Sequence, residues 1–443
     1  MAWYDGFLNN LPEVASPKEK RLGFKKKLTW TLTILVIYFV LGLIPVFGAG
    51  ESTLQQLEFM SIVLGAQFGS IISLGIGPIV TASIILQLLN GSGLFKFDMT
   101  TPEGKKRFQG FQKILSIFFI ILEAFIYVNL GGIAPRAGVS PLLLVFQLFL
   151  GGIMIMFMDE VISKWGFGSG ISLFIAAGVS KTIFTQLFSF ISEQGSPYFI
   201  GKVWQVFQAF LNLDGQTAGL ALGAILATIG VFAFVVYVQS MKVEIPLSFG
   251  RIRGHGIRWP LNFLYTSNIP VILVAALLAN IQLFARLITG SANSTLANWV
   301  SAPNLLNAGL TGSISGVMLA QGFVYLMIMT GGAVLFSWFW VQTSGLDARS
   351  QAKQIMSSGL SIPGFRKDQR VLERLLNRYI QPLTVMGGIA IGLLAGLADL
   401  TGAIGSGTGI LLTVMIVYRL YEEIAKEHMY DMNPMMRKFM GGE

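Results

Sequence analysis

Apolar stretches of about 20 residues recur along this chain and alternate with short polar segments. A helix rises about 1.5 Å per residue, so about 20 residues cross the roughly 30 Å hydrocarbon core of a bilayer. With one shorter stretch at 74–89, the pattern predicts an all-α polytopic membrane protein with about ten transmembrane helices. The longer stretches lie near residues 28–47, 111–130, 141–158, 171–190, 218–238, 262–287, 316–341, 379–398 and 404–424.

The stretch from Leu74 to Leu89, LGIGPIVTASIILQLL, is too short to span alone, because it would be only about 24 Å long as a helix. A Gly/Pro break opens it. Broken helices at membrane depth occur only where protein covers them or water reaches them, so we expect this stretch to face an interior passage. The preceding piece, Ser52–Gly65, is too short and too polar to span, and the two together predict one discontinuous second span.

The composition excludes several kinds of chemistry. Of the 443 residues, 53% are hydrophobic and 12% are charged, which excludes a soluble domain of this size. There is no cysteine, and the two histidines, His255 and His428, lie outside the apolar stretches. We therefore expect no disulfide, no metal site, no cofactor and no enzymatic activity. The glycine-rich strings at Gly166 and Gly405 follow no predicted strand and carry no P-loop lysine, so they predict helix starts at the membrane edge.

The basic residues predict the orientation of the chain. Lys and Arg near the ends of spans stay on the cytoplasmic side. If the N-terminus is inside, 27 of the 31 Lys and Arg fall in cytoplasmic segments, and one missed helix would invert this bias downstream. We expect a multi-pass protein of the cell membrane with both termini cytoplasmic. The four exceptions are Arg136, Lys181, Lys202 and Arg286.

Two of the cytoplasmic segments are long and strongly basic. Residues 241–260 contain GRIRGHGIRWP, with Arg251, Arg253 and Arg258, and residues 342–378 contain PGFRKDQRVLERLLNR. One interpretation is that these charges only orient the chain. The other is that they dock a partner rich in phosphate groups. The residues alone leave both open.

An internal repeat relates the broken stretch to the seventh apolar stretch. The sequences are PIVTASIILQLL from Pro78 and PVILVAALLANIQL from Pro270, and Val80 and Ile272 fall at the same offset from these prolines. The two would cross the membrane in opposite directions, with about four spans between them. Such an inverted repeat is typical of proteins in which each half supplies one wall of a central passage.

Few polar groups lie within the predicted spans. Glu123 is the main ionisable one, and the energy needed to bury a carboxylate favours a functional role, although a structural role stays open. The uncharged candidates are Thr81, Gln87, Asn268 and Asn280, which are typical of interhelical hydrogen bonds. Asp159, Glu160 and Asp399 lie at span ends, where we expect their side chains to reach the interface.

Several motifs in order along nearly the whole chain carry a resemblance to a known family. They are LGIGPIVTA from Leu74, GFGSGISLFIAAGVS from Gly166, VEIPLSFGRIRG from Val243, SNIPVILVAALLANIQ from Ser267, IPGFRK from Ile362 and GTGILLTVMIVYRLYEE from Gly407. Together they resemble the SecY family, the channel-forming subunit of the Sec protein translocon, and the archaeal type most. The resemblance implies two inverted five-helix halves that form a clamshell, hinged between the fifth and sixth spans.

This implies a division of the chain into four parts: a cytoplasmic amphipathic N-terminal segment at 1–27, a first half at 28–215, a second half at 216–426 and a cytoplasmic tail at 427–443. The first half would contain spans 1 to 5 and a plug at 52–65. The second would contain spans 6 to 10 and the cytoplasmic loops 241–261 and 342–378.

The resemblance also implies three functional sites. A ring of aliphatic side chains would close the pore, and motif matching assigns it Ile76, Val80, Ile171, Ile175, Ile272 and Leu412. A lateral gate would lie between the second and third spans and the seventh and eighth, with Thr81, Glu123 and Asn280 as its polar cluster. The basic loops would dock the ribosome, including its RNA, through Arg251, Arg253, Arg366 and Lys367.

The function implied is that of a passive protein-conducting channel that translocates secretory polypeptides and releases transmembrane segments into lipid through the gate. The implied partners are SecE-type and small beta-type single-span subunits, the ribosome, signal peptides, nascent chains and membrane lipid. A secondary transporter also uses inverted repeats, but it needs convergent polar ligands at the midplane, where the matched positions here are aliphatic. An intramembrane enzyme is a third class, and the chain offers it no His or Cys constellation.

Overall fold

The structure is a computed structural model that describes most of the chain. The described residues are 11–19, 22–50, 69–91, 94–95, 97, 101–129, 133–192, 198–249, 256–266, 268–289, 295–357, 360–361 and 368–432. The predicted plug at 52–65 lies outside them.

Ten helices form the body of the molecule, as the apolar pattern predicts. Eight are long and apolar enough to cross a membrane, by length and composition within the described residues. The ninth, α4, is short and apolar, and the tenth, α16, changes from apolar to charged along its length. The ten are α2 (Phe24–Leu43), α4 (Gly77–Gly91), α5 (Pro102–Asn129), α6 (Pro141–Trp165), α7 (Gly170–Phe188), α9 (Gly215–Ser240), α10 (Ile269–Thr289), α13 (Gly316–Thr343), α15 (Gln369–Leu400) and α16 (Gly407–Met432).

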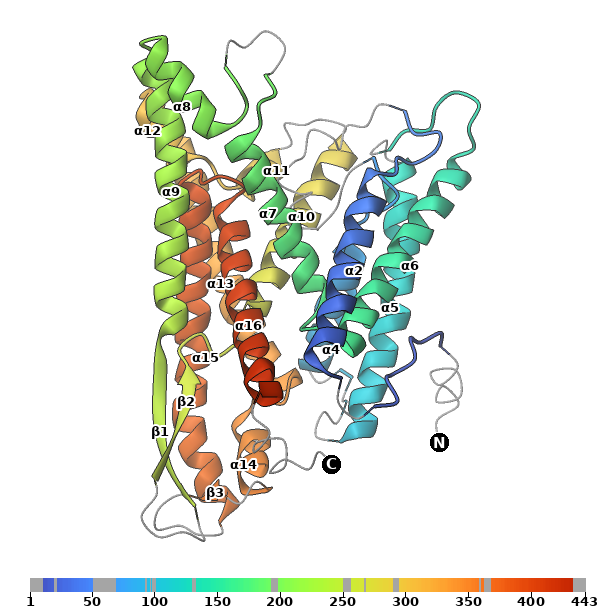
Figure 1. Cartoon of the computed structure of the whole chain (residues 1–443), viewed down its shortest axis with the longest axis vertical. Coiled ribbons are helices and arrows are strands. Elements are labelled where there is room, and N and C mark those ends of the chain that lie inside the picture. Colours follow the sequence, from blue (N-terminus) through green and yellow to red (C-terminus); the bar gives the residue numbers. More distant parts are fainter. Residues whose placement is uncertain are drawn as a thin grey trace.

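The helices gather in two groups. Helices α2, α4, α5 and α6 lie on one side in Figure 1, whereas α9, α13, α15 and α16 lie on the other, with α7 and α10 between them. Short helices complete the upper end: α8 (Lys202–Leu211), α11 (Thr295–Trp299) and α12 (Leu305–Thr311). This arrangement agrees with a clamshell of two halves. The division of the chain at residue 215 stays a prediction.

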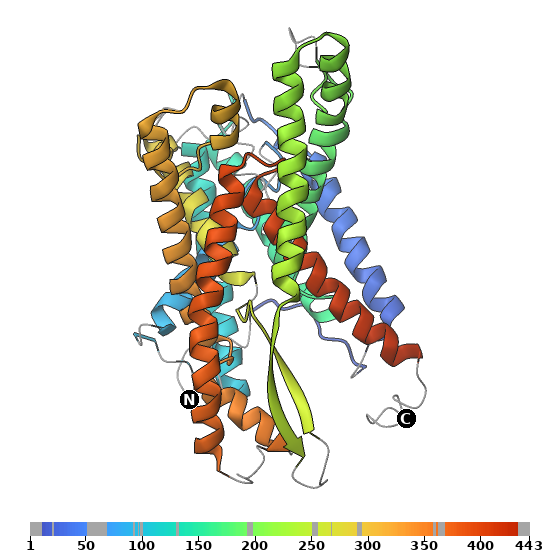
Figure 2. The ribbon, with the colours of Figure 1, turned by 90° about the vertical axis from the view of Figure 1, so that its left-hand side faces the viewer.

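The basic segments at the lower end contain regular structure that the hydrophobic pattern did not predict. Strands β1 (Lys242–Phe249), β2 (Gly256–Asn262) and β3 (Leu360–Ser361) form an antiparallel sheet in the order β2-β1-β3. The long hairpin of β1 and β2 continues downward from the end of α9, at the level of the lower part of α15 (Figure 2). The sequence does contain a pattern typical of a strand, because apolar residues alternate with polar residues or proline in KVEIPLSF.

A second departure concerns two span boundaries. Helix α15 begins at Gln369, before the predicted start at 379, so the basic segment before that span is helical. Helix α10 begins at Ile269 rather than 262, because residue 262 still belongs to strand β2 and residues 263–266 form bends and turns. Strand β2, the end of α13, α14 (Ala348–Ser357) and the first part of α15 share a small core of their own. Its buried residues are Leu261, Val341, Ala348, Ala352, Ile355, Leu372, Leu376, Ile380 and Leu383.

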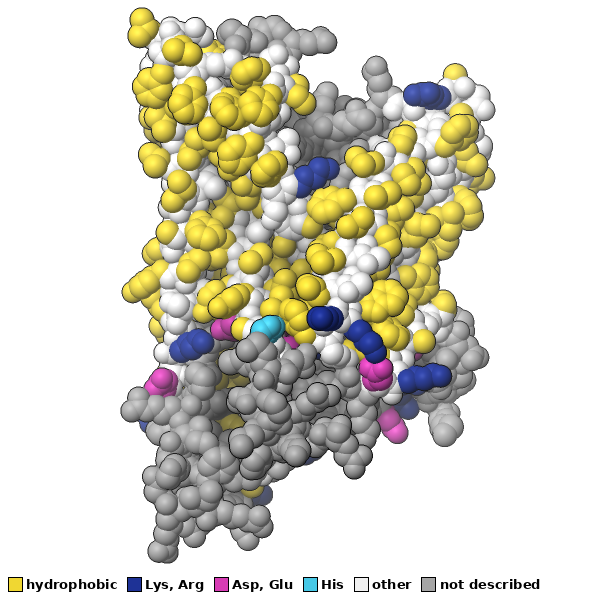
Figure 3. Space-filling view, in the orientation of Figure 1, with side chains coloured by type: hydrophobic (Ala, Val, Ile, Leu, Met, Phe, Trp, Pro, Cys, Tyr) yellow, Lys and Arg dark blue, Asp and Glu magenta, His cyan; other side chains and the backbone are white. Residues whose placement is uncertain are grey.

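The outer surface has the two zones of a membrane protein. Hydrophobic side chains cover the upper part of the face shown in Figure 3, and charged side chains gather in a band toward the lower end. Helix α9 illustrates the apolar zone, with large exposed side chains that include Leu226, Ile229 and Phe232. In lipid such a surface needs no further protein cover.

Candidate pore, lateral gate and basic loops

The two repeat segments begin their helices in the same way. Pro78 is the second residue of α4 and Pro270 is the second residue of α10. Proline fits this position because the first N–H groups of a helix have no intrahelical partner. A turn with Gly75 at φ +56° precedes α4. Val80 and Ile272 therefore lie one turn into two helices that enter the molecule from opposite ends.

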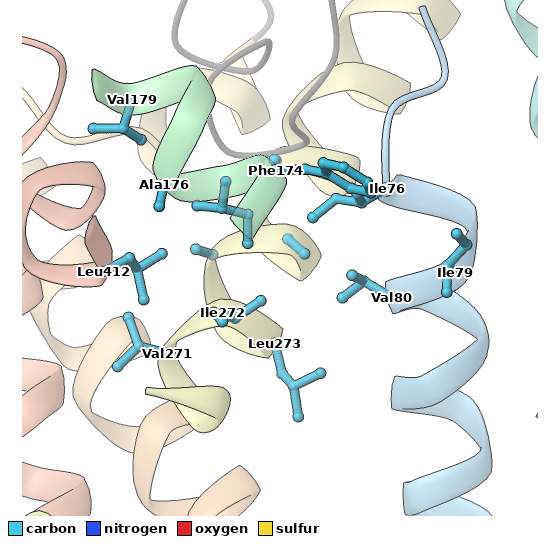
Figure 4. Close-up of a cluster of buried hydrophobic side chains, with 14 of the residues drawn as sticks. Ile76, Ile79, Val80, Phe174, Ala176, Val179, Val271, Ile272, Leu273 and Leu412 are labelled. Atoms are coloured by element: carbon cyan, nitrogen blue, oxygen red, sulfur yellow. The ribbon is translucent and has the colours of Figure 1, made fainter. Parts of the chain in front are cut away.

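The six residues predicted to form the ring all lie in the main hydrophobic core or against it. Ile76, Val80, Ile175, Ile272 and Leu412 belong to one buried cluster and are each at most 6% exposed. Ile171 is partly buried and packs against that cluster. The contributing helices are α4, α7, α10 and α16, so both halves take part. Figure 4 shows Val80, Ile272 and Leu412 around a common space, whereas Ile79 lies on the other side of its helix.

A cavity of about 700 Å³ leads to this cluster. Its lining includes the charged side chains of Lys105, Arg419 and Glu423, and also the aliphatic side chains of Val80, Ile171 and Ile272. The remaining ring residues, Ile76, Ile175 and Leu412, do not line the cavity and are buried beyond it. The wall of the cavity therefore contains both charged groups and three of the predicted ring residues.

The three residues predicted for the gate meet at one point. Asn280 Nδ2 on α10 donates to Thr81 Oγ1 on α4 at 2.9 Å. Thr81 Oγ1 lies 3.4 Å from Glu123 Oε1 on α5 and 2.8 Å from the carbonyl oxygen of Gly77. Because the hydroxyl has a single hydrogen, it cannot donate fully to both acceptors. This cluster links α4 and α5 of the first half to α10 of the second.

Several polar atoms of the gate cluster have no hydrogen-bond partner among the described residues. Glu123 Oε2, Asn280 Oδ1 and the Tyr127 hydroxyl are buried and have no hydrogen-bond partner among the described residues. Tyr127 follows Glu123 by one turn on α5 and is completely buried. Tyr127 is not among the gate residues predicted from the sequence. The spacing of four residues from Glu123 was the available signal, because it places both side chains on one face of a helix.

Other polar residues of the spans line the cavity. Ser83 Oγ on α4 accepts a hydrogen bond from Gln112 Nε2 on α5 at 2.7 Å, which ties the two helices together. Gln87 and Asn268 are buried side chains that line the cavity. The described residues contain no group of three or more His, Asp or Glu that could hold a metal ion.

The predicted docking residues Arg251, Arg253, Arg366 and Lys367 lie outside the described residues. The strands that lead to them are described. Strand β1 pairs with β3 through Ser248 opposite Ser361 and Phe249 opposite Leu360. The backbone therefore enters the two basic segments from neighbouring positions, although they are more than 100 residues apart in the sequence.

The expectation that all three acidic residues at the span ends reach the interface was wrong for two of them. Asp399 is 8% exposed and accepts hydrogen bonds from the Tyr325 hydroxyl at 2.6 Å and from the Thr408 N–H at 2.7 Å. Asp159 accepts one from the Ile171 N–H at 2.9 Å. Only Glu160 behaves as an interfacial group, in contact with Lys113 and Lys164. The helix starts predicted from the glycine strings are confirmed, because α7 begins at Gly170 and α16 at Gly407.

Comparisons with known proteins cover nearly the whole chain. A family model described as SecY matches residues 70–421, and one described as the plug domain of Sec61p matches residues 36–69. The protein translocase subunit SecY of Methanothermobacter thermautotrophicus is 44% identical over 99% of this chain and 98% of its own. A solved structure of a protein conducting channel aligns with a TM-score of 0.82 and 41% identity, covering 96% of this chain and 97% of the other. Sec61 in the canine ribosome-channel complex from the endoplasmic reticulum aligns with a TM-score of 0.79 and 40% identity, with the same coverage.

Proposed function

The chain belongs to the SecY family, and we propose on this basis how its ring, gate and basic loops act. It is the channel-forming subunit of a protein translocase, a multi-pass membrane protein through which polypeptides pass. The relatives described above are translocase subunits and protein channels, and they give no support to a secondary transporter. We infer that this chain conducts passively, without a catalytic step of its own.

The cavity lined by charged side chains and by three of the predicted ring residues is the observation that supports this mechanism. Side chains such as Val80, Ile272 and Leu412 offer neither charge nor hydrogen bonds, so a passing polypeptide of any sequence finds few sites at which to stop. A narrow apolar constriction also dewets, which opposes the leak of ions while the channel is closed. We infer that the plug predicted at 52–65 adds to this seal.

Crosslinking tests the proposed passage. A photoreactive residue in place of Ile272 should crosslink to a secretory chain arrested during translocation. The matched control is the same residue in place of Ile79, whose side chain lies on the other side of α4 (Figure 4). Equal crosslinking from both positions, or none from Ile272, would contradict the assignment.

The gate cluster supports release of apolar segments into lipid. Helix α4 packs against both α10 and α13, and this contact is the proposed exit. Opening separates Thr81 and Glu123 from Asn280, and a transmembrane segment that enters lipid offsets the lost hydrogen bonds. We infer that the strength of the cluster sets how hydrophobic a segment must be to leave.

The paired strands β1 and β3 support a joint role for the two basic segments. They bring the chain to Arg251 and Arg253 and to Arg366 and Lys367 from adjacent positions, which suits a single docking surface for the ribosome and its RNA. Binding through phosphate contacts falls steeply as salt rises. The competing proposal is that these charges only orient the chain, with both termini in the cytoplasm.

Charge-reversal variants distinguish ribosome docking from orientation of the chain alone. Arg366→Glu should weaken ribosome binding in co-sedimentation and flatten its salt dependence. Arg286→Glu changes the net charge equally at the last turn of α10, at the other end of the bundle, and should leave binding unaltered. Unaltered binding in Arg366→Glu would favour orientation alone. We also propose that SecE-type and beta-type single-span subunits cover part of the apolar outer surface.

A further inference from the structure

Two carboxylates, the half-buried Asp159 and the buried Asp399, hold the starts of two pore helices in the same way. Helix α7 begins in the string Gly168, Ser169, Gly170, and the next N–H group, that of Ile171, donates to Asp159 Oδ1 at 2.9 Å. The Gly170 N–H and the Ser169 hydroxyl also bond to this carboxylate. Asp159 belongs to the preceding helix, α6. The carboxylate therefore joins one helix to the beginning of the next.

The second half repeats the arrangement. Helix α16 begins in the string Gly405, Ser406, Gly407, and the next N–H group, that of Thr408, donates to Asp399 Oδ1 at 2.7 Å. The Thr408 hydroxyl and the Gly407 N–H bond to the same carboxylate. Asp399 belongs to the preceding helix, α15. The register matches, because in both halves the acceptor takes the N–H of the residue after the second glycine.

Close backbone contact accompanies each carboxylate. A Cβ at Gly170 would lie 2.6 Å from the Cα of Asp159, and a Cβ at Gly407 would lie 2.0 Å from the carbonyl carbon of Ala398. Neither position has room for a side chain. Gly168 and Gly405 have φ values of +68° and +74°, which glycine adopts most readily. The turn, the contact and the carboxylate together fix where each helix begins.

The ring residues sit at a fixed distance beyond these starts. Ile175 is four residues after Ile171, and Leu412 is four residues after Thr408, so the two occupy equivalent places in the two halves. Helices α6 and α15 contribute nothing to the lining of the cavity. They can therefore serve as supports against which the pore helices are held.

We propose that Asp159 and Asp399 are an equivalent pair of positioning residues that set the height and rotation of α7 and α16, and with them Ile175 and Leu412 in the ring. The first N–H groups of a helix need acceptors, and in a low-dielectric interior a carboxylate is a strong one that also favours the helix dipole. This inference rests on the proposed role of the ring as the constriction.

The test uses the absence of cysteine from the natural chain. A single cysteine at Ile175 or Leu412 reports exposure of the ring to a charged thiol reagent. Asp159→Ala should raise the labelling rate at position 175 about tenfold, as expected for loss of one helix cap, and should increase ion leak in planar bilayers. Asp399→Ala should do the same at position 412. Each change should act on its own helix.

Matched variants separate positioning from a general loss of structure. Glu160→Ala removes the neighbouring carboxylate of α6, which contacts Lys113 and Lys164, and should leave labelling and leak unaltered. Tyr325→Phe removes one partner of Asp399 but leaves its bonds to α16, and should have a smaller effect than Asp399→Ala. Asp159→Asn keeps an acceptor oxygen and should rescue most of the labelling defect. If the alanine variants do not accumulate, Ser169→Ala and Tyr325→Phe, which each remove one hydrogen bond of these carboxylates, should raise labelling at position 175 or 412 by a smaller factor, and unaltered labelling in both would contradict the positioning role.

The outcomes distinguish this inference from the proposed function. Val80→Asp tests the ring without touching either carboxylate and should increase ion leak. If Val80→Asp leaks but Asp159→Ala and Asp399→Ala neither leak nor change labelling, the positioning role is wrong and the channel assignment stands. If none of the three leaks, the ring itself is not the constriction.

Discussion

The two halves meet along two seams that are held by different forces. The gate seam, where α4 and α5 face α10, contains the hydrogen bonds of Thr81 with Asn280 and Glu123 and leaves several polar atoms unpaired. The packed seam, where α7 faces α16, is closely packed: a Cβ at Gly409 would lie 3.2 Å from Val179 Cγ2, and one at Gly405 would lie 3.0 Å from Ile183 Cγ1.

This difference indicates which seam opens. A few hydrogen bonds in a membrane contribute about 0.6 to 2 kcal/mol each, and water or an entering chain can replace them. Close packing has no such substitute, because separating the surfaces loses every dispersion contact at once. We infer that the halves turn about the packed seam while the polar seam separates.

The largest expected effect comes from disrupting the packed seam. Gly409→Leu forces a side chain against Val179 and Ser406, and overpacking of this kind lowers the unfolding free energy by about 1 to 3 kcal/mol. Gly178→Leu is the control, because a Cβ at Gly178 meets nothing within 4 Å. Thermal unfolding of the purified protein measures both. Equal melting temperatures would show that the packed seam has room for a side chain at Gly409.

A smaller effect is expected at the gate seam. Asn280→Leu removes the donor to Thr81, a loss of about 1 kcal/mol. An apolar residue at the centre of a helix contributes about 0.3 to 0.6 kcal/mol to insertion, so the variant should accept signal sequences with about two to three fewer leucines. Translocation of a graded signal series measures this threshold.

The control for the gate is a polar residue on the same helix. Gln282 donates to the carbonyl oxygen of Val300 rather than to α4, so Gln282→Leu should leave the threshold in place. A threshold that does not move in Asn280→Leu would exclude the cluster from gating. A threshold that moves equally in both variants would assign the effect to α10 as a whole.

The ion pair between the halves at the charged end should contribute less. Lys27 on α2 contacts Glu427 on α16, and their side chains are 21% and 25% exposed. Exposed pairs contribute about 0 to 1 kcal/mol, so Glu427→Gln should lower stability only slightly. Glu422→Gln, which breaks a pair with Lys242 inside the second half, is the matched control. A double-mutant cycle on Lys27 and Glu427 measures the coupling energy between them. A value above about 2 kcal/mol would show that this pair contributes strongly to holding the two halves together.

The smallest effect concerns a contact between the N-terminal segment and α6 of the first half, which should affect neither seam. Lys164 Nζ bonds Glu13 Oε1 at 2.5 Å, and this hydrogen bond lowers the pKa of Glu13 below its ordinary value of 4.5. A lowered carboxyl pKa contributes stability that is complete above 4.5 and is lost as the pH falls through the lowered pKa. The segment around Glu13 should therefore loosen from α6 only in acid.

A spin label at Ser16, introduced as Ser16→Cys, measures this release. Its mobility should rise as the pH falls below 4.5, while channel leak stays unchanged. In Glu13→Gln the mobility should be high already at neutral pH and should show no acid step. A pH-dependent step that persists in Glu13→Gln would assign the titration to another group.

Much of the fold could be predicted from the sequence because these features depend on residues that are close together in the chain. The number of spans follows from apolar length, the break before Pro78 from Gly and Pro, and the helix starts at Gly170 and Gly407 from glycine strings. The counterpart of Val80 at Ile272 follows from the repeat. The hairpin of β1 and β2 was not predicted, although apolar and polar residues alternate in β1, because the strongly basic segment was interpreted as a loop.

The gate and ring residues were selected through the resemblance, and only the tertiary structure showed how they meet. Thr81 and Asn280 are 199 residues apart, and no local rule places their side chains 2.9 Å from each other. The roles of Asp159 and Asp399 differ from expectation for the same reason. A carboxylate at a span end can reach water or cap the next helix, and the path of the following turn decides between the two. The sequence by itself determined which segments enter the membrane, because transfer into lipid depends on composition, whereas the fold decided which buried polar groups find partners, because a hydrogen bond depends on position.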